Sequence, residues 1–392
     1  MYDLAIIGGG PAGAAAAYYA ARAGLSVCVL ERERFPRDKV CGDGLTARAI
    51  AVIQDMGLES AVAARAARIT RCAVHAPYTA TDAPLTAAPG FPDYAYVLPR
   101  RELDELLIRH AVAAGAELRE GTEVLGWRAQ ADGVWIDTDG ELVCARFALL
   151  ACGAHLKLPL RMKLLAAKPR MMVAARAYVA RGASAGDAWH LDFCRLAAPG
   201  YGWVFPVSAD CANVGIGFFA ARRGRAPAAA VPRYLRLAAT RRALGGDVAA
   251  GEIKSFPLRV DFPTAPLSQG RVWVIGEAAG LVNPATGEGI DYALESGRMA
   301  AQQLAGALRA DMSALQATQE YERALHAHYD PIFDFSARLV PWCSRPWAVS
   351  ALALAARRRP RLRDRLVQIM LGGGEPSRMP DARRILRAVL RG

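Results

Sequence analysis

The stretch that decides the fold is DLAIIGGGPAGAAAAYYAARAGLSVCVLE, residues 3–31. A short apolar run from Leu4 to Ile7 is followed by a glycine cluster, an alanine-rich segment and a second apolar run that ends at Glu31. Short apolar runs bounded by turn residues are typical of buried strands, and the alanine-rich segment favours a helix. The order predicts a βαβ unit with a glycine turn after its first strand.

The glycines of this turn, Gly8, Gly10 and Gly13, have the spacing G-x-G-x-x-G. The first lets the chain leave the strand tightly, the second lets backbone approach a pyrophosphate, and the third lets the helix pack closely on the strand. The helix N-terminus then offers unpaired N–H groups to the phosphates. Glu31 follows Gly13 by 18 residues, where a carboxylate can accept the ribose hydroxyls. The pattern predicts a dinucleotide site for FAD or NAD rather than NADP.

Length and composition set outer limits on the class of protein. The 392 residues suffice for two domains or one large composite domain. The first strand begins at residue 3, so we expect no signal peptide, and no apolar run reaches the roughly 20 residues that span a bilayer. The eight cysteines include no C-x-x-C pair, which favours a reducing compartment without disulfides or zinc. We therefore expect a cytoplasmic protein without a metal site.

The formal net charge of +12 is concentrated toward the C-terminus. Arginines gather in RRRPRLRDR, residues 357–365, and in ARRILRAVLR, residues 382–391. Aromatic residues do not interleave with these arginines, so we expect no nucleic-acid partner. A basic surface beside apolar helix faces favours peripheral contact with the inner face of an anionic membrane, or with an acidic partner. An ordinary solvated helix face explains the same pattern about equally well.

A second informative stretch is RVWVIGEAAGLVNPATGEGIDYALESGRMAA, residues 271–301. An apolar strand ends at Gly276 and is followed at once by Glu277, whose carboxylate can hold a ribityl chain. A turn then opens a helix at 287–289, where the N–H groups of Gly289 and Ile290 can bind the polar edge of a flavin ring. By itself the stretch also suits an ordinary strand–turn–helix unit, but its pairing with the N-terminal glycine motif favours a cofactor.

The middle of the chain changes character. Residues 166–265 contain many aromatic residues, alternating runs and turn signals, which predict a separate antiparallel sheet. The fold class expected is α/β, with a discontinuous Rossmann-type FAD-binding domain, an inserted antiparallel β-sheet substrate domain and a helical C-terminal region. The predicted FAD-binding segments are 1–68, 96–165 and 266–325, the substrate-binding segments are 69–95 and 166–265, and the basic helical region is 326–392.

Several motifs together carry a family resemblance. GGGPAG with Glu31, R-x-x-L-D at Arg100–Asp104 and GEAAGLVNPATGEGI resemble the flavoprotein group of aromatic hydroxylases and geranylgeranyl reductases. Two motifs are similar to the reductase branch: PRDKVCGDGL at 36–45, and YGWVFP at 201–206 followed by G-x-G at 215–217. The resemblance covers most of the chain up to about residue 310. It implies a two-electron reduction of a carbon–carbon double bond in an apolar, isoprenoid substrate by FAD.

The resemblance also implies roles for individual residues. Cys41 and Gly42 are expected beside the flavin ring and are the catalytic candidates, although a small residue tolerated in a tight loop is the favoured explanation of Cys41. Tyr201, Trp203 and Phe205 are expected to line the substrate pocket, or to form only a sheet core. The FAD-binding residues expected are Gly8, Gly10, Ala12, Gly13, Glu31, Arg32, Cys41, Gly42, Arg100, Val124, Gly276, Glu277, Gly287, Gly289 and Ile290.

The sequence departs from the family pattern at three places. Glu277 stands where aspartate is usual, Cys152 replaces the acid of an A-D-G motif, and Val207-Ser208 follows the FP pair where lysine is common. The second change leaves the electron donor open between NAD(P)H and a ferredoxin-like protein, and it favours the protein donor. Two alternatives to the reductase remain: a flavin monooxygenase or halogenase acting on an aromatic or carrier-bound substrate, and a flavin-binding partner protein without turnover.

Overall fold

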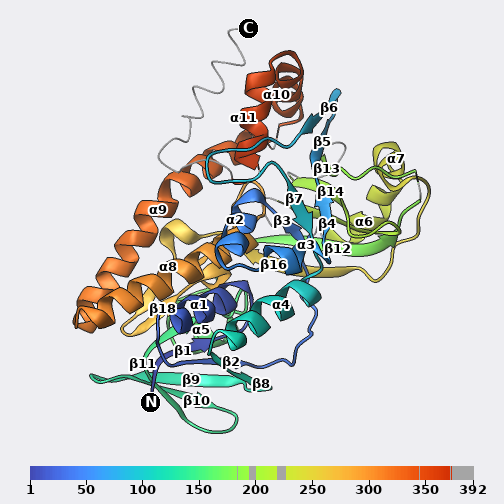
Figure 1. The fold of residues 1–392 in the computed structure, drawn as a ribbon. Helices are drawn as coiled ribbons and strands as arrows, with labels where there is room; N and C mark the ends of the chain where they lie inside the picture. Colours follow the sequence, from blue (N-terminus) through green and yellow to red (C-terminus); the bar gives the residue numbers. More distant parts are fainter. Residues whose placement is uncertain (183, 194–199, 219–226, 344, 371, 373–392) are drawn as a thin grey trace.

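The computed structural model describes residues 1–182, 184–193, 200–218, 227–343, 345–370 and 372. This part of the chain contains an eight-stranded sheet, a seven-stranded sheet, a three-stranded sheet and the helices that cover them. Figure 1 shows the N-terminal βαβ unit at one end of the molecule and the last helices at the opposite end.

The eight-stranded sheet carries the glycine turn. β1 (Tyr2–Ile7) pairs in parallel with β2 (Val27–Glu31) on one side and with β11 (Val143–Leu150) on the other. α1 (Pro11–Arg22) connects β1 to β2, so the predicted βαβ unit is confirmed. The other strands of this sheet are β8 (Glu117–Glu120), β9 (Val124–Ala129), β10 (Val134–Thr138), β17 (Ser268–Gln269) and β18 (Val272–Val274).

Residues 117–129 form two strands rather than one. β8 ends at Glu120 and β9 begins at Val124, because the chain turns at Gly121, where φ is +71°. β8 extends the parallel sheet beyond β2, whereas β9 pairs only with β10. A turn after Thr138 then leads from β10 into β11, and these two strands pair antiparallel.

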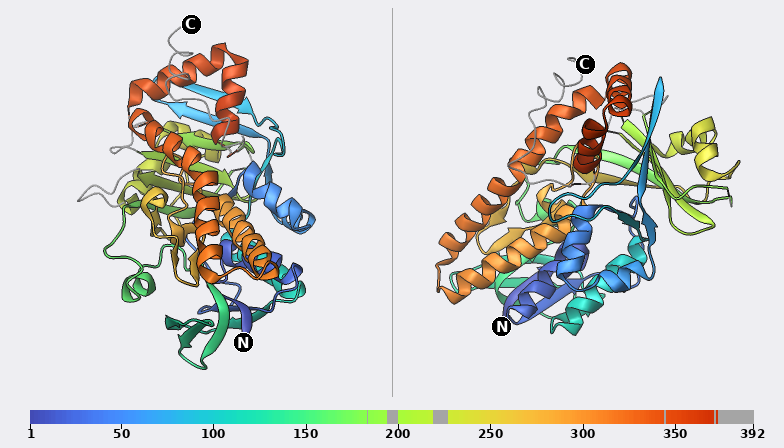
Figure 2. Two further views of the ribbon diagram at one scale, coloured as in Figure 1. Left: turned by 90° about the vertical axis from the view of Figure 1, so that its left-hand side faces the viewer. Right: turned by 45° about the horizontal axis from the view of Figure 1, so that its top comes forward.

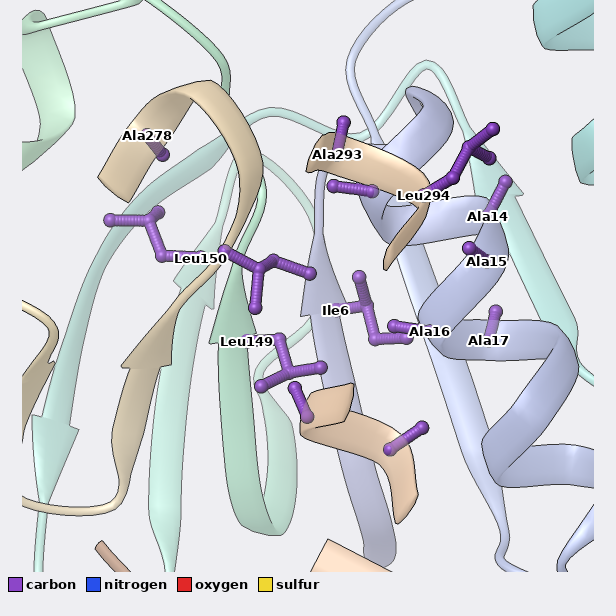
Figure 3. Packing of buried hydrophobic residues seen from close by; sticks show 14 of the residues in the cluster. Ile6, Ala14, Ala15, Ala16, Ala17, Leu149, Leu150, Ala278, Ala293 and Leu294 are labelled. Carbon is purple, nitrogen blue, oxygen red and sulfur yellow. The ribbon is translucent and has the colours of Figure 1, made fainter. Parts of the chain in front are cut away.

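Small residues let the two helices nearest the glycine turn approach closely. Figure 3 shows Ala14, Ala15, Ala16 and Ala17 of α1 beside Ile6, with Ala293 and Leu294 of α8 (Ile290–Arg309) near them. A Cβ atom on Gly297 of α8 would lie 2.3 Å from the Ala12 carbonyl oxygen. The alanine run therefore brings the starts of two helices to the same edge of the sheet.

The seven-stranded sheet joins distant parts of the chain. Its order is β16-β12-β15-β14-β13-β5-β6, so a hairpin from 71–84 adds to strands from 171–259. The expected antiparallel pairing is wrong at one place, because β5 and β13 pair in parallel where that separate hairpin joins the sheet. The strands are β5 (Arg71–Ala76), β6 (Thr79–Pro84), β12 (Met171–Ala180), β13 (Trp189–Asp192), β14 (Gly200–Pro206), β15 (Cys211–Phe218) and β16 (Lys254–Arg259).

Smaller elements connect and cover the two sheets. α6 (Pro227–Leu235) and α7 (Ala238–Leu244) pack on one face of the seven-stranded sheet through Tyr234 and Leu244. The three-stranded sheet has the order β3-β7-β4. The remaining elements before α8 are β3 (Gly44–Leu45), α2 (Ala47–Asp55), α3 (Glu59–Ala63), β4 (Ala67–Ile69), β7 (Ala95–Val97), α4 (Arg100–Ala113), α5 (Lys157–Arg161), η1 (Phe262–Thr264) and η2 (Gly276–Ala279).

The last three described helices cross from the first sheet to the second. α9 (Ala314–Cys343) runs without a break through the expected boundary at 325/326. α10 (Pro346–Arg358) and α11 (Pro360–Met370) then lie beside β5 and β6 (Figures 1 and 2). The Thr81 hydroxyl donates to the Ala353 carbonyl oxygen at 2.9 Å, and Gln368 Nε2 donates to the Ala87 carbonyl at 2.8 Å. The second basic stretch, 382–391, lies outside the described residues.

Among the described residues, none of the helices combines the length and the apolar character needed to cross a bilayer. The seven cysteines within this part of the chain are all free thiols. No group of three or more histidine, cysteine or carboxylate side chains in it has the geometry to hold a metal ion.

Candidate functional site

A cavity of about 790 Å³ extends from the glycine turn to the C-terminal helices. It brings together all but two of the residues that the sequence nominated. Those that line it are Gly8, Gly10, Ala12, Glu31, Arg32, Cys41, Gly42, Arg100, Val124, Tyr201, Trp203, Phe205, Glu277, Gly287, Gly289 and Ile290.

The other two nominated residues, Gly13 and Gly276, contact backbone and side chains instead. A Cβ atom on Gly13 would lie 1.9 Å from the Gly8 carbonyl oxygen. Gly276 has a φ of +61°, and its Cβ would lie 2.8 Å from that of Ala12. Both glycines therefore allow α1 to pack closely on the backbone next to the cavity wall.

Glu31 holds the glycine turn in place from the end of β2. Its Oε2 accepts a hydrogen bond from the Gly9 N–H at 2.8 Å, and its Oε1 accepts one from the Glu33 N–H at 3.0 Å. The side chain is buried at the cavity wall. The structure thus brings the carboxylate to the place where the βαβ spacing predicts an adenosine ribose.

Two arginines face the backbone of the turn across the cavity. A Cβ atom built on Gly10 would meet only Arg37 Nη2 at 3.7 Å and Arg100 Nη2 at 3.9 Å. Asp104 orients both guanidinium groups, at 3.0 Å from Arg37 Nη1 and 2.6 Å from Arg100 Nε. Arg37 Nε is buried and has no hydrogen-bond partner within the described residues. This cradle fits a diphosphate, because guanidinium groups and backbone N–H groups suit phosphate oxygens. The sequence reading missed Arg37.

A buried carboxylate that the sequence reading also missed organises the loop after β2. Asp43 is fully buried and has a φ of +64°, which is uncommon outside glycine. Its Oδ2 accepts hydrogen bonds from the Tyr178 hydroxyl at 2.5 Å and from Asn213 Nδ2 at 2.8 Å. Its Oδ1 accepts one from the Arg100 N–H at 3.2 Å. Burial raises the pKa of Asp43 to about 6. The feature of the sequence that could have identified Asp43 is its place between two glycines in CGDG.

The same network positions the loop residues nominated for catalysis. Asn213 Nδ2 also donates to the Cys41 carbonyl oxygen at 2.8 Å. Burial raises the pKa of the Cys41 thiol, so the thiol is protonated at neutral pH. A Cβ atom on Gly42 would lie 3.5 Å from Trp203 and from Phe205. The loop therefore lies directly against the aromatic wall of the cavity.

The aromatic side chains of β14 are both sheet residues and cavity wall. Trp203 is buried, and its Nε1 donates to Asn213 Oδ1 at 2.9 Å. Its ring occupies the space over Gly215, where a Cβ atom would lie 2.1 Å from the ring. Phe205 stacks on Trp189, with 4.7 Å between ring centroids. These aromatic residues therefore belong both to the core of the sheet and to the wall of the cavity.

Two of the three departures from the family pattern, Glu277 and Cys152, lie on the cavity wall, whereas Val207 and Ser208 do not line it. Glu277 Oε1 accepts from the Arg259 N–H at 3.4 Å, and its Oε2 lies 4.0 Å from Lys39 Nζ. Burial lowers the pKa of Lys39 to about 8. The Cys152 thiol donates to the His155 carbonyl at 3.5 Å, and burial raises its pKa to about 12. Cys152 is therefore neutral where the family has a carboxylate.

A tight loop precedes α8 and places a further carboxylate at the cavity. Asn283 Oδ1 accepts from the N–H groups of Ala285 at 2.9 Å and Thr286 at 3.3 Å, and Gly287 has a φ of +72°. α8 begins at Ile290, one residue after the predicted opening. Glu288, between the two nominated glycines of this loop, also lines the cavity.

The far half of the cavity is mostly apolar, and the C-terminal helices form much of its wall, to which Ser336 of α9 and Arg363 of α11 add polar groups. The sequence reading treated these helices only as a basic surface. The apolar residues of the sheet that line this half are Cys72, Val74, Met172, Leu191, Phe193 and Leu258, and those of α9, α10 and α11 are Ile332, Phe335, Leu339, Val349, Leu352, Ala353, Ala356, Leu366, Val367, Ile369 and Met370.

Comparison with known proteins identifies relatives of this chain. Residues 1–142 match the FAD binding domain family. A menaquinone reductase of Mycolicibacterium smegmatis is 32% identical over 94% of this chain and 91% of its own length. A digeranylgeranylglycerophospholipid reductase of Methanopyrus kandleri is 28% identical over 86% of this chain and 85% of its own.

Solved structures of flavoproteins have the same fold. A geranylgeranyl bacteriochlorophyll reductase-like protein of Thermoplasma acidophilum superposes with a TM-score of 0.75 and 23% identity, covering 99% of this chain and 95% of that one. A flavin-dependent brominase superposes with a TM-score of 0.77 and 18% identity, covering 100% and 98%. The identity to the curated relatives and the diphosphate cradle agree with the motifs: the chain belongs to the geranylgeranyl reductase family of FAD-dependent oxidoreductases.

Proposed function

We propose that this enzyme saturates a carbon–carbon double bond in an isoprenoid chain, and that the chain belongs to a prenylated quinone such as menaquinone. The observation that carries the proposal is the apolar half of the cavity between the seven-stranded sheet and α9–α11. An isoprenoid chain is apolar throughout and gains free energy from leaving water along its whole length. The printed names of the two curated relatives, a menaquinone reductase and a digeranylgeranyl lipid reductase, support this substrate class.

In this proposal the polar half of the cavity holds FAD. Gly10, Arg37 and Arg100 bind the diphosphate, Glu31 accepts from the adenosine ribose, and Glu277 accepts from the ribityl chain. When bound and reduced, the flavin supplies the hydride. The chain's own contribution is to place the double bond beside Cys41 and Gly42, between the flavin and the aromatic wall, and to keep water away.

The seven-stranded sheet and the C-terminal helices together form the substrate domain in this proposal. Trp203 and Phe205 approach the loop of Gly42 closely, so they confine the chain on the side of the cofactor. Val349 and Ala353 of α10 confine it on the opposite side. A flat, flexible chain fits between such walls without any polar partner.

We also propose that the enzyme receives electrons from a ferredoxin-like protein rather than from NAD(P)H. Cys152 lines the cavity as a neutral thiol, and a thiol is a poor acceptor for a polar donor. The arginines at the end of α10, including the exposed Arg357 and Arg358, offer an acidic protein a complementary surface.

The proposed site of membrane contact is the outer face of α10. Trp347 and Leu354 are 55% and 41% exposed there, and Tyr78 at the tip of the β5–β6 hairpin is 79% exposed. The Tyr78 N–H donates to Ser350 of the same helix at 3.3 Å. Exposed aromatic and apolar side chains beside arginines suit the interface of an anionic bilayer. The opposite face of this helix lines the cavity, so an isoprenoid lipid need travel only a short way.

The test is a single turnover without oxygen. The flavin is reduced photochemically, mixed with menaquinone, and the product is exposed to air before mass spectrometry. Saturation of the prenyl chain survives air, and a product heavier by two hydrogens is expected. A product that returns to the starting quinone in air would mean that only the ring is reduced. Oxygen consumption with a hydroxylated or halogenated product would instead support the monooxygenase or halogenase.

A further inference from the structure

We infer that Glu288 is the general acid of this enzyme, donating its carboxylic proton to one carbon of the double bond while the other carbon accepts hydride. This inference rests on the proposed function and assigns a chemical role to a residue that the binding motifs leave without one. It follows from where the side chain lies, how it is held and what surrounds it.

The position of Glu288 is at the junction of the two halves of the cavity. It lies between Gly287 and Gly289, which are expected at the edge of the flavin ring, and its side chain lines the cavity. The Tyr201 hydroxyl, from the aromatic wall, donates to the carbonyl oxygen of Thr286 in the same loop. Glu288 is therefore next to both the expected reaction site and the substrate wall.

The loop holds the carboxyl group in a defined place. The Thr286 hydroxyl donates to Glu288 Oε2 at 3.2 Å, and the Glu288 N–H donates to that hydroxyl oxygen at 3.4 Å. The Asn283 N–H donates to the Glu288 carbonyl at 2.8 Å. Oε1 has no hydrogen-bond partner among the described residues, so it is the oxygen available to a substrate.

The surroundings favour the protonated form of this carboxyl group. Within the part of the chain that the structure describes, no cation forms an ion pair with Glu288. Burial and the nearby Asp291 raise its pKa well above the ordinary value, against smaller opposing effects of Thr286 and Arg48. The other titratable groups that face it are Tyr201 of β14, Tyr292 of α8 and Cys72 of β5. A carboxylic acid that stays neutral near pH 7 is suited to general acid catalysis.

The thiol and hydroxyl proton donors near the loop are weaker acids than a carboxyl group. Burial raises the pKa of the Cys41 thiol, and burial also raises that of the Tyr201 hydroxyl. The Tyr201 hydroxyl hydrogen is in addition already donated to the Thr286 carbonyl. Glu288 is thus a stronger acid than either of these groups. Asp43 and Asp291 also line the cavity, with pKa values raised to about 6, but both oxygens of each already accept hydrogen bonds, whereas Glu288 Oε1 accepts none among the described residues.

The step balances as a two-electron reduction. One alkene carbon accepts a hydride from the bound, reduced flavin, and the π electron pair forms a new C–H bond with the proton of Glu288. The O–H bond of Glu288 breaks, which leaves a carboxylate. Solvent reprotonates that carboxylate before the next turnover, and the electron donor of the enzyme reduces the flavin again.

The experiment compares Glu288→Gln with Glu141→Gln, which changes an exposed glutamate in the turn before β11. Infrared spectroscopy of the FAD-loaded protein at pH 7 is expected to show a protonated carboxylic acid band in the wild type and in Glu141→Gln. The band is expected to lose intensity in Glu288→Gln, where only partly protonated groups such as Asp43, with a pKa of about 6, still contribute. This readout requires no turnover, and absence of the band in the wild type overturns the inference.

The kinetic test measures the rate at which the prenyl substrate reoxidises the reduced flavin in a single turnover. Glu288→Gln is expected to slow it about 10²–10⁴-fold with normal FAD content, and Glu288→Asp to recover part of the rate. The wild-type rate should fall as pH rises through the raised pKa, whereas the slow variant should lose that dependence. A wild type that saturates the chain beside an equally fast Glu288→Gln overturns the acid role alone. A wild type that saturates no prenyl chain overturns the proposed function and the acid role with it.

Discussion

Gly10 and Gly13 belong to one motif, but each must be glycine for a different reason. The Cβ position of Gly10 points toward Arg37 and Arg100 with nothing nearer than 3.7 Å, so only a bound diphosphate requires the glycine. The Cβ position of Gly13 lies 1.9 Å from the Gly8 carbonyl, so the fold itself requires that glycine.

This difference predicts opposite outcomes for two alanine substitutions. Gly10→Ala should fold with unchanged stability of the apoprotein but retain little FAD, because the methyl group occupies the space of the diphosphate. Gly13→Ala should unfold at lower temperature even without FAD, because α1 must move off β1. Flavin absorbance after purification and thermal unfolding of the apoproteins measure both effects. A Gly10→Ala protein with a full complement of FAD would contradict the assignment of this turn.

Cys152 carries the prediction about the electron donor. A carboxylate in its place could accept a charge-assisted hydrogen bond, which is worth about 1.5–3 kcal/mol, or one to two decades in affinity. Cys152→Asp is therefore expected to speed reduction of the flavin by NADPH, measured by stopped-flow bleaching of its absorbance. Cys152→Ser serves as the control without charge. Rapid, saturable bleaching of the wild type by micromolar NADPH would show that no protein donor is needed.

At the scale of helices, a buried ion pair joins α2, α8 and α9. Arg48 Nη1 lies 3.0 Å from Glu295 Oε2, and His328 Nε2 lies 3.1 Å from the same oxygen. Arg48 Nε also donates to the Gly372 carbonyl at 3.0 Å. Burial opposes ionisation of Glu295, but His328 and Arg48 more than offset this and lower its pKa to about 2. This contact ties the C-terminal helices to the FAD-binding part of the chain.

The lowered pKa of Glu295 makes the stability of the folded protein depend on pH. The folded state holds Glu295 ionised more strongly than the unfolded chain, so its contribution is fully present above the ordinary glutamate pKa of 4.5 and is lost as pH falls toward 2. Glu295→Gln should lower the free energy of unfolding by about 3 kcal/mol at pH 7, and the difference from wild type should shrink between pH 5 and about 3. Urea unfolding of FAD-saturated protein across this range measures it. A difference independent of pH would mean that packing, rather than charge, is lost.

At the scale of the whole molecule, α10 has two apolar faces with different exposures. Val349 and Ala353 are buried against the cavity and the hairpin, whereas Trp347 and Leu354 face outward. Burying the outer pair in a bilayer would bring the cavity wall to the membrane surface. The expected orientation places the nucleotide end, with the N-terminus, away from the membrane (Figure 1).

Trp347→Ser combined with Leu354→Ser should therefore weaken sedimentation with vesicles of anionic phospholipid. The expected loss is about 2–4 kcal/mol of binding free energy, since each fully buried large apolar side chain contributes about 1.5–3 kcal/mol. FAD content and turnover of a water-soluble, short-chain substrate should not change. Met312→Ser with Leu315→Ser, which removes an exposed apolar pair near the start of α9, is the matched control. Equal binding of both double variants and the wild type would place the membrane contact elsewhere.

The sequence by itself determined the cofactor end of this protein. The glycines, the acid after β2 and the strand–turn–helix before α8 each act through spacing within about 30 residues, where backbone geometry leaves few alternatives. It also indicated a second sheet from the alternation of β12, β14 and β15, because a period of two is a local property of each strand. Cys41, Trp203 and Glu277 came from motifs of the same local kind.

Only the tertiary structure decided which distant segments complete the site. Asp43 acquires its role by meeting Tyr178 and Asn213, which lie more than a hundred residues away and carry no local mark of the contact. The parallel pairing of β5 with β13 likewise depends on where a hairpin docks rather than on its own pattern. The sequence predicted the C-terminal helices to form a basic surface, because their arginines are evident in it. Their inner faces became a wall of the cavity only when folding set them against β5 and β6, since burial depends on the partner as much as on the helix.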